Sequence, residues 1–118
     1  MSEAVVDIKE VMERVQDDKE LLVELFDIFQ DDYTDKRRQI TNLIAKKDHD
    51  ELRNVAHSLK GASSNISAKN IYASFTKLEK MAEQKDLSAV DALLKDIDEG
   101  YKELQAFIVQ YKKNERKF

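Results

Sequence analysis

Apolar residues recur every three or four positions along almost the whole chain, and no proline interrupts them. This spacing gives a helix one continuous apolar stripe, whereas a half-buried strand would show strict alternation. Only two glycines occur in 118 residues, which leaves little room for the tight turns of β-hairpins. The pattern therefore predicts an all-α fold, and a chain of this length can bury one modest core in a single domain, residues 1–118.

The apolar stripes and the candidate capping residues together predict five helices. Asp17 or Asp18 is expected to cap the second helix. Asp48, with Glu51 three residues later, has the spacing of a capping box at the start of the third. The predicted helices lie at about 5–15, 18–46, 48–66, 68–84 and 90–111.

Short connections between the last four helices favour an antiparallel up-down four-helix bundle over residues 18–111. Residues 1–17 add a short N-terminal helix, and residues 112–118 form a polar tail that is expected to fray. Asp32 and Lys36 fall on the projected core face of the second helix, so this helix is either broken or protrudes there. One long helix is favoured, because no glycine or proline interrupts it.

Composition excludes several classes of function. The absence of cysteine excludes a disulfide scaffold, a thiolate zinc site and a cysteine nucleophile. A net charge of −4 argues against nucleic acid as a partner. No apolar run approaches the ~20 residues of a membrane helix, and no secretory signal is visible, so a cytoplasmic location without membrane association is expected. His49 and His57 lie about 80° apart around a helix and two turns along it, so no metal site is expected.

The third predicted helix carries polar residues on the side opposite its apolar stripe. Projected at 100° per residue, five of them share the face that points away from the core. A glycine inside a helix costs about 0.5–1 kcal/mol relative to alanine, and no core contact requires a small residue on this face. An outside partner that approaches closely would explain the glycine. The five residues are Arg53, His57, Lys60, Gly61 and Ser64.

These residue types suit phosphoryl transfer. An exposed neutral imidazole has a nucleophilic ring nitrogen that can accept a phosphoryl group. Lys60 lies three residues after His57, where it can offset the charge of the phosphoryl oxygens. A lone exposed histidine is usually only a surface residue, and an outer lysine is usually a solvated charge. Their coincidence with Gly61 on one face favours the functional interpretation.

The sequence AHSLKGASSNISA at residues 56–68 closely resembles the signature of histidine-containing phosphotransfer (HPt) domains, approximately A-H-x-L-K-G-x-x-x-x-x-G-A. The resemblance extends over roughly residues 18–111. Phe29 lies where the family has a phenylalanine, and Asp48 matches the acidic residue that begins the active helix. Residues 77–87, KLEKMAEQKDL, are similar to the family's Leu-Glu segment and following turn.

The resemblance implies a role for each matching position. His57 corresponds to the phosphoacceptor, which the family phosphorylates at Nε2. Lys60 corresponds to the lysine near the phosphoryl group, and Gly61 to the glycine that lets the partner approach. Ser64 is expected as polar lining, whereas the role of Asn65 stays open.

One position departs from the family pattern. Ser67 stands where the family usually has a glycine, which is expected to end the active helix. We interpret the departure as a change in turn chemistry, with Ser67 as a candidate cap of the following helix, and expect phosphoryl transfer to be intact.

The resemblance further implies a phosphorelay intermediate that exchanges phosphoryl groups with receiver-domain aspartates. Response-regulator receivers or a hybrid sensor histidine kinase are the expected partners. They would supply the carboxylate and the Mg²⁺, so the chain itself needs no cofactor and no kinase activity. In agreement, no carboxylate cluster around His57 and no nucleotide-binding motif are visible in the sequence. The expected docking surface combines the third helix with Arg53, Arg37 and Arg38, which suit an acidic pocket, and the expected state is a monomer.

Two alternatives remain open at this point. The chain can be the phosphoacceptor domain of a chemotaxis-type histidine kinase, although Met1 favours a free-standing protein. It can also be a helical adaptor that is never phosphorylated.

Overall fold

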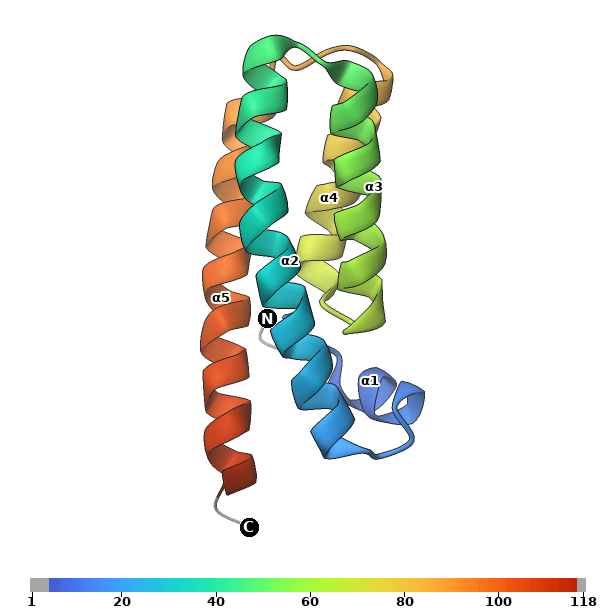
Figure 1. Ribbon diagram of the computed structural model, residues 1–118, viewed down its shortest axis with the longest axis vertical. Coiled ribbons are helices and arrows are strands. Elements are labelled where there is room, and N and C mark those ends of the chain that lie inside the picture. Colours follow the sequence, from blue (N-terminus) through green and yellow to red (C-terminus); the bar gives the residue numbers. More distant parts are fainter. Residues whose placement is uncertain (1–4, 117–118) are drawn as a thin grey trace.

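The computed structural model describes residues 5–116, which form five α-helices and no strand. Helices α2 to α5 run alternately up and down as an antiparallel bundle, and α1 lies below the turn between α3 and α4 (Figure 1). The predicted all-α four-helix bundle with a short N-terminal helix is therefore confirmed. The helices are α1 (Ile8–Arg14), α2 (Lys19–Lys46), α3 (His49–Asn65), α4 (Lys69–Glu83) and α5 (Val90–Arg116).

Both predicted aspartate caps are present. The Asp18 carboxylate accepts a hydrogen bond of 3.0 Å from the backbone N–H of Leu21, so Asp18 rather than Asp17 begins α2. The Asp48 carboxylate accepts one of 3.2 Å from the N–H of Glu51 at the start of α3. Each cap satisfies a backbone donor that the helix itself cannot pair.

The Asp48 cap gives a test of how the start of α3 is stabilised. Replacing Asp48 with Ala is expected to lower the free energy of unfolding by about 1 kcal/mol, because one backbone donor loses its partner. Asp48→Asn keeps an accepting oxygen at the same place and serves as the control. Urea denaturation measures both variants, and equal losses for Ala and Asn would contradict the capping role.

Helix α2 is continuous over 28 residues, as predicted. The polar residues in its middle are paired at the edge of the core. The Lys36 ammonium donates to the Asp32 carboxylate at 3.0 Å and to the Ser58 hydroxyl of α3 at 2.6 Å. The polar segment therefore does not break the helix, because its charged groups satisfy one another beside α3.

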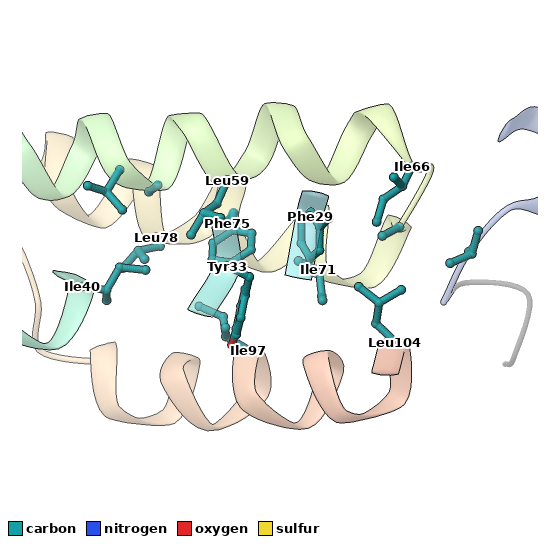
Figure 2. Close-up of a cluster of buried hydrophobic side chains, with 14 of the residues drawn as sticks. Phe29, Tyr33, Ile40, Leu59, Ile66, Ile71, Phe75, Leu78, Ile97 and Leu104 are labelled. Atoms are coloured by element: carbon teal, nitrogen blue, oxygen red, sulfur yellow. The ribbon is translucent and has the colours of Figure 1, made fainter. Parts of the chain in front are cut away.

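Side chains from α2, α3, α4 and α5 meet in one core (Figure 2). Aromatic rings join the two long helices, since Tyr33 of α2 stacks on Tyr101 of α5 with ring centroids 3.7 Å apart. Burial raises the pKa of the Tyr33 phenol, which stays a hydrogen-bond donor to Asp98. The one glycine outside α3 belongs to this packing, because a Cβ on Gly100 would lie 3.3 Å from Cγ1 of Ile71.

The predicted end of the last helix at Tyr111 was wrong, because α5 continues through Arg116. Tyr111 packs edge-on against Phe26 of α2, and Lys112 pairs with Asp27 at 2.5 Å. These contacts keep the end of α5 against α2. The remainder of the predicted frayed tail, residues 117–118, lies outside the described residues, as do residues 1–4.

Ser67 occupies the turn that ends α3, with a φ of 53° in the left-handed region that favours glycine. Its N–H donates to the carbonyl of Ser64, and the next N–H, of Ala68, donates to the carbonyl of Ser63. These two bonds form a Schellman motif. Ser67 therefore ends α3. The expectation that it caps α4 was wrong, since Ala68 holds that position without a side-chain cap.

Helix α1 secures this turn. The Ser67 hydroxyl donates to the Glu10 carboxylate at 2.8 Å, and the Asp7 N–H donates to the Ser67 carbonyl at 2.9 Å. The Glu10 carboxylate also accepts from the Lys69 ammonium at 2.8 Å. The N-terminal helix thus attaches to the end of the helix that carries the candidate site.

Candidate functional site

Helix α3 presents His57 on its outer side. The inner side buries Leu52 and Leu59 completely, whereas 67% of the His57 side chain is exposed. Gly61 follows one turn later, and a Cβ placed on it would meet no atom within 4 Å. The prediction that no internal contact requires this glycine is confirmed. The space above Gly61 is open to a partner.

A carboxylate of the neighbouring helix contacts the imidazole. Oε2 of Glu79 on α4 lies 2.8 Å from Nδ1 of His57. An ionised carboxylate can only accept hydrogen bonds, so the proton of this bond comes from Nδ1–H. In the neutral ring, the other nitrogen, Nε2, then carries the free lone pair. The contact therefore leaves Nε2 as the ring nitrogen whose lone pair is free.

The same carboxylate binds the candidate lysine. Nζ of Lys60 lies 2.6 Å from Oε1 of Glu79, whose side chain is only 12% exposed. The Lys60 hydrogen bond, and after it the His57 hydrogen bond, lower the pKa of Glu79. Reciprocally, Glu79 raises the pKa of Lys60. Both groups are therefore ionised at neutral pH, and one carboxylate joins the ring to the ammonium.

Glu79 is the functional residue that the sequence reasoning missed. The sequence shows no carboxylate cluster around His57, and the single carboxylate that contacts the ring comes from another helix. One signal was present in the α4 sequence, where polar residues at helical spacing flank the apolar stripe. They form one side of the helix, at Tyr72, Thr76, Glu79 and Glu83.

Exposed and partly exposed residues along α3 and α4 form a polar seam. It is defined here as Arg53, His57, Lys60, Gly61 and Ser64 on α3, with Tyr72, Glu79 and Glu83 opposite them on α4. Nη1 of Arg53 lies 3.9 Å from Oε1 of Glu83, with both side chains half exposed. At the other end, Ser64 and Tyr72 line a notch of about 380 Å³ beside α1. Five of the predicted site residues thus share one accessible seam.

The sequence matches the Hpt domain over residues 24–107, which span most of α2 to α5 and include His57. The chain belongs to the Hpt family. Its role is phosphotransfer through histidine in the phosphorelays of two-component signalling. Hpt phosphotransfer proteins are not kinases, and they interact with receiver domains and kinases.

A solved structure has the same fold as this Hpt chain. The crystal structure of histidine-containing phosphotransfer protein B (HptB) from Pseudomonas aeruginosa PAO1 superposes with a TM-score of 0.79. The match covers 97% of this chain and 96% of that one at 23% sequence identity. Among curated proteins, none matches the chain.

The two arginines predicted on α2 do not join the polar seam of the Hpt domain. Arg37 forms a two-pronged ion pair with Asp98 of α5, with distances of 2.8 and 3.1 Å. It therefore lies on the side of α2 that faces α5. Arg38 is exposed and has no ion-pair partner within residues 5–116. The cation that α2 brings beside α3 is Lys36, at Ser58.

The described residues were also compared with what a metal site and a membrane-spanning helix require. Within residues 5–116, no three histidine, cysteine, aspartate or glutamate side chains lie where they could share a metal ion. His49, the second histidine, is the first residue of α3 and is partly buried. None of the described helices combines the length and the apolar character that crossing a bilayer requires.

Proposed function

We propose that His57 is the phosphoacceptor of this Hpt domain and that it reacts through Nε2. The observation that supports the proposal is the 2.8 Å contact between Nδ1 and Glu79, which leaves the lone pair on the other, exposed nitrogen. The rigid face of α3 holds the ring better than a loop would. No other histidine of the chain has a carboxylate contact among the described residues.

The reaction exchanges a phosphoryl group with a receiver aspartate. The Nε2 lone pair of His57 forms the N–P bond, while the P–O bond to the aspartate breaks and its electron pair stays on the departing carboxylate. Passing the group to a second receiver reverses these steps. The receiver supplies the Mg²⁺, the ammonium of Lys60 offsets phosphoryl charge, and Gly61 leaves room for the receiver.

The partners in this proposal are response-regulator receivers, a hybrid sensor histidine kinase, or both. The chain acts as a monomer in the cytoplasm, without a cofactor of its own and without kinase activity. The sequence supports the last point, because two glycines cannot form a glycine-rich phosphate loop. Arg53 and Ser64 of the polar seam are the proposed receiver contacts.

A single experiment separates a relay intermediate from a chemotaxis-type phosphoacceptor. The purified chain is incubated with a receiver that carries an aspartyl phosphate, in Mg²⁺ and without ATP or kinase. A relay intermediate becomes phosphorylated on His57. A domain that is supplied only by an ATP-dependent kinase stays unlabelled, and so does a helical adaptor, and either result would refute the proposal.

Replacing Lys60 with Ala is expected to slow transfer from the receiver about tenfold to hundredfold, because one positive charge beside the phosphoryl oxygens is lost. Folding should change little, since the Lys60–Glu79 pair lies at the surface. Lys77→Ala is the matched control. Lys77 lines a groove between α4 and α5, and His57 is not among the residues that line this groove. Rapid-quench measurement of labelled protein gives both rates. Equal rates for the two variants would contradict the role of Lys60.

A further inference from the structure

The carboxylate of Glu79 contacts the ring nitrogen opposite the one that receives the phosphoryl group. We propose that Glu79 keeps the Nδ1 proton on His57 throughout the transfer cycle and so holds the phosphohistidine in its labile, protonated form. Glu79 is in this sense a positioning residue that acts through His57. The inference rests on His57 as phosphoacceptor and adds what sets the lifetime of the phosphorylated state.

The chemistry follows from counting protons. A neutral ring with Nδ1–H that forms an N–P bond at Nε2 becomes a cation, and no proton needs to move. When the N–P bond breaks, its electron pair returns to Nε2 and the ring leaves as neutral imidazole. If Nδ1 lost its proton in between, the leaving group would be an imidazolate anion, which leaves far more slowly. A hydrogen-bonded carboxylate favours the charged, protonated ring.

The geometry suits this task. The Glu79 side chain is only 12% exposed, and its two oxygens are fixed by contacts of 2.8 Å with His57 and 2.6 Å with Lys60. The helices beneath are held by completely buried side chains, Leu59 on α3 and Leu78 and Phe75 on α4. The relative positions of the imidazole ring and the carboxylate are therefore fixed by the packing of the two helices. An imidazole oriented by a partly buried carboxylate is also the arrangement that serine hydrolases use for a ring that becomes charged.

The surrounding charges leave Glu79 as the group that governs the ring. Lys60 lowers the pKa of Glu79, so its carboxylate is ionised over the whole neutral range. Next along the polar seam, Arg53 and Glu83 face each other and offset each other's charge. On the side of α2, the charges of Lys36 and Asp32 also offset each other, beside Ser58. Tyr72 is the other residue of the seam with an ionisable side chain.

The test compares the lifetime of phosphohistidine in the wild type and in Glu79→Gln. Glutamine keeps the size and can accept a hydrogen bond, but it carries no charge to hold the proton. Each protein is phosphorylated with phosphoramidate, which needs no partner, and the loss of the phosphoryl group is followed by ³¹P NMR. Glu83→Gln is the matched control, since it makes the same change one turn further along α4.

The wild type and Glu83→Gln are expected to lose the phosphoryl group at a rate that changes little between about pH 6 and pH 8. Glu79→Gln is expected to hold it about tenfold longer at the upper end of this range, because its ring loses the Nδ1 proton as the pH rises. Its rate should approach that of the wild type as the pH falls. A merely structural role would not produce this pH profile.

A second readout uses the unphosphorylated protein. Nitrogen-15 NMR of the ring is expected to show the Nδ1–H tautomer in the wild type and a mixture of tautomers in Glu79→Ala. Phosphorylation of His57 with equal lifetimes in the wild type and Glu79→Gln would overturn this inference alone. A wild-type ring protonated at Nε2 would also overturn it. If no variant is phosphorylated on His57, the proposed function fails together with the inference.

Discussion

His57→Gln is expected to abolish phosphoryl uptake from a receiver, while helix content and the free energy of unfolding stay near the wild-type values. The glutamine amide nitrogen has no lone pair available for attack, so no N–P bond can form. Position 57 tolerates the change because its side chain is 67% exposed and fills no core space. The lost contact with Glu79 lies at the surface, where such pairs contribute about 0–1 kcal/mol.

Transfer of radiolabelled phosphate from a phosphorylated receiver measures the loss. The label on the wild type should be acid-labile and alkali-stable, as expected for a phosphoramidate. His49→Gln removes the other histidine of the chain from the start of α3 and should be labelled like the wild type. Labelling that persists in His57→Gln would refute the assignment of the phosphoacceptor.

Gly61→Val is expected to slow transfer between the receiver and His57 by about tenfold to hundredfold, since a small displacement of the reacting atoms is enough for such losses. The branched side chain would project into the space where the receiver approaches. The helix itself has room for it, because a Cβ at position 61 meets no atom within 4 Å. Valine and glycine also differ by less than about 0.5 kcal/mol in helix propensity.

Gly61→Ala separates the effect of a side chain on helix stability from its effect on transfer. Alanine is expected to raise the free energy of unfolding by about 0.5–1 kcal/mol, because glycine is the poorer helix former. Its single methyl group should slow transfer less than valine does. Stability and transfer rate should therefore move in opposite directions, which denaturation and rapid-quench kinetics measure separately. Wild-type transfer rates in Gly61→Val would refute the steric role of the glycine.

Phosphorylation by phosphoramidate identifies the step at which Gly61→Val acts. This small donor needs little space, so His57 should react with it at the wild-type rate in the valine variant. A loss with both donors would instead indicate a disturbed ring. The comparison separates obstruction of the receiver from damage to the nucleophile.

Much of the fold could be predicted from local patterns. The caps at Asp18 and Asp48 depend on contacts three residues apart, and the continuous α2 depends on the absence of proline and glycine. The outward position of His57 and the open space at Gly61 follow from 3.6 residues per turn on one helix. Such features depend on residues close in the sequence, so their spacing alone was sufficient.

The errors concern contacts between helices. The ion pair of Arg37 with Asp98 of α5, 61 residues away, was not predicted, and the partner contact of Arg37 stays a prediction. The end of α5 was placed at Tyr111, but packing on Phe26 and the pair between Lys112 and Asp27 extend the helix. Each outcome depends on how two helices are rotated and shifted against each other. The apolar pattern of one helix does not determine which residue of another helix pairs with a polar residue beside the apolar stripe.

The candidate site combines both kinds of information. The sequence by itself determined that His57, Lys60 and Gly61 lie on one outward face of one helix, because this follows from 3.6 residues per turn. Only the tertiary structure decided which ring nitrogen is free to react. That depends on Glu79, which reaches Nδ1 from α4 because buried side chains of both helices, Leu59 and Leu78 among them, pack in one core.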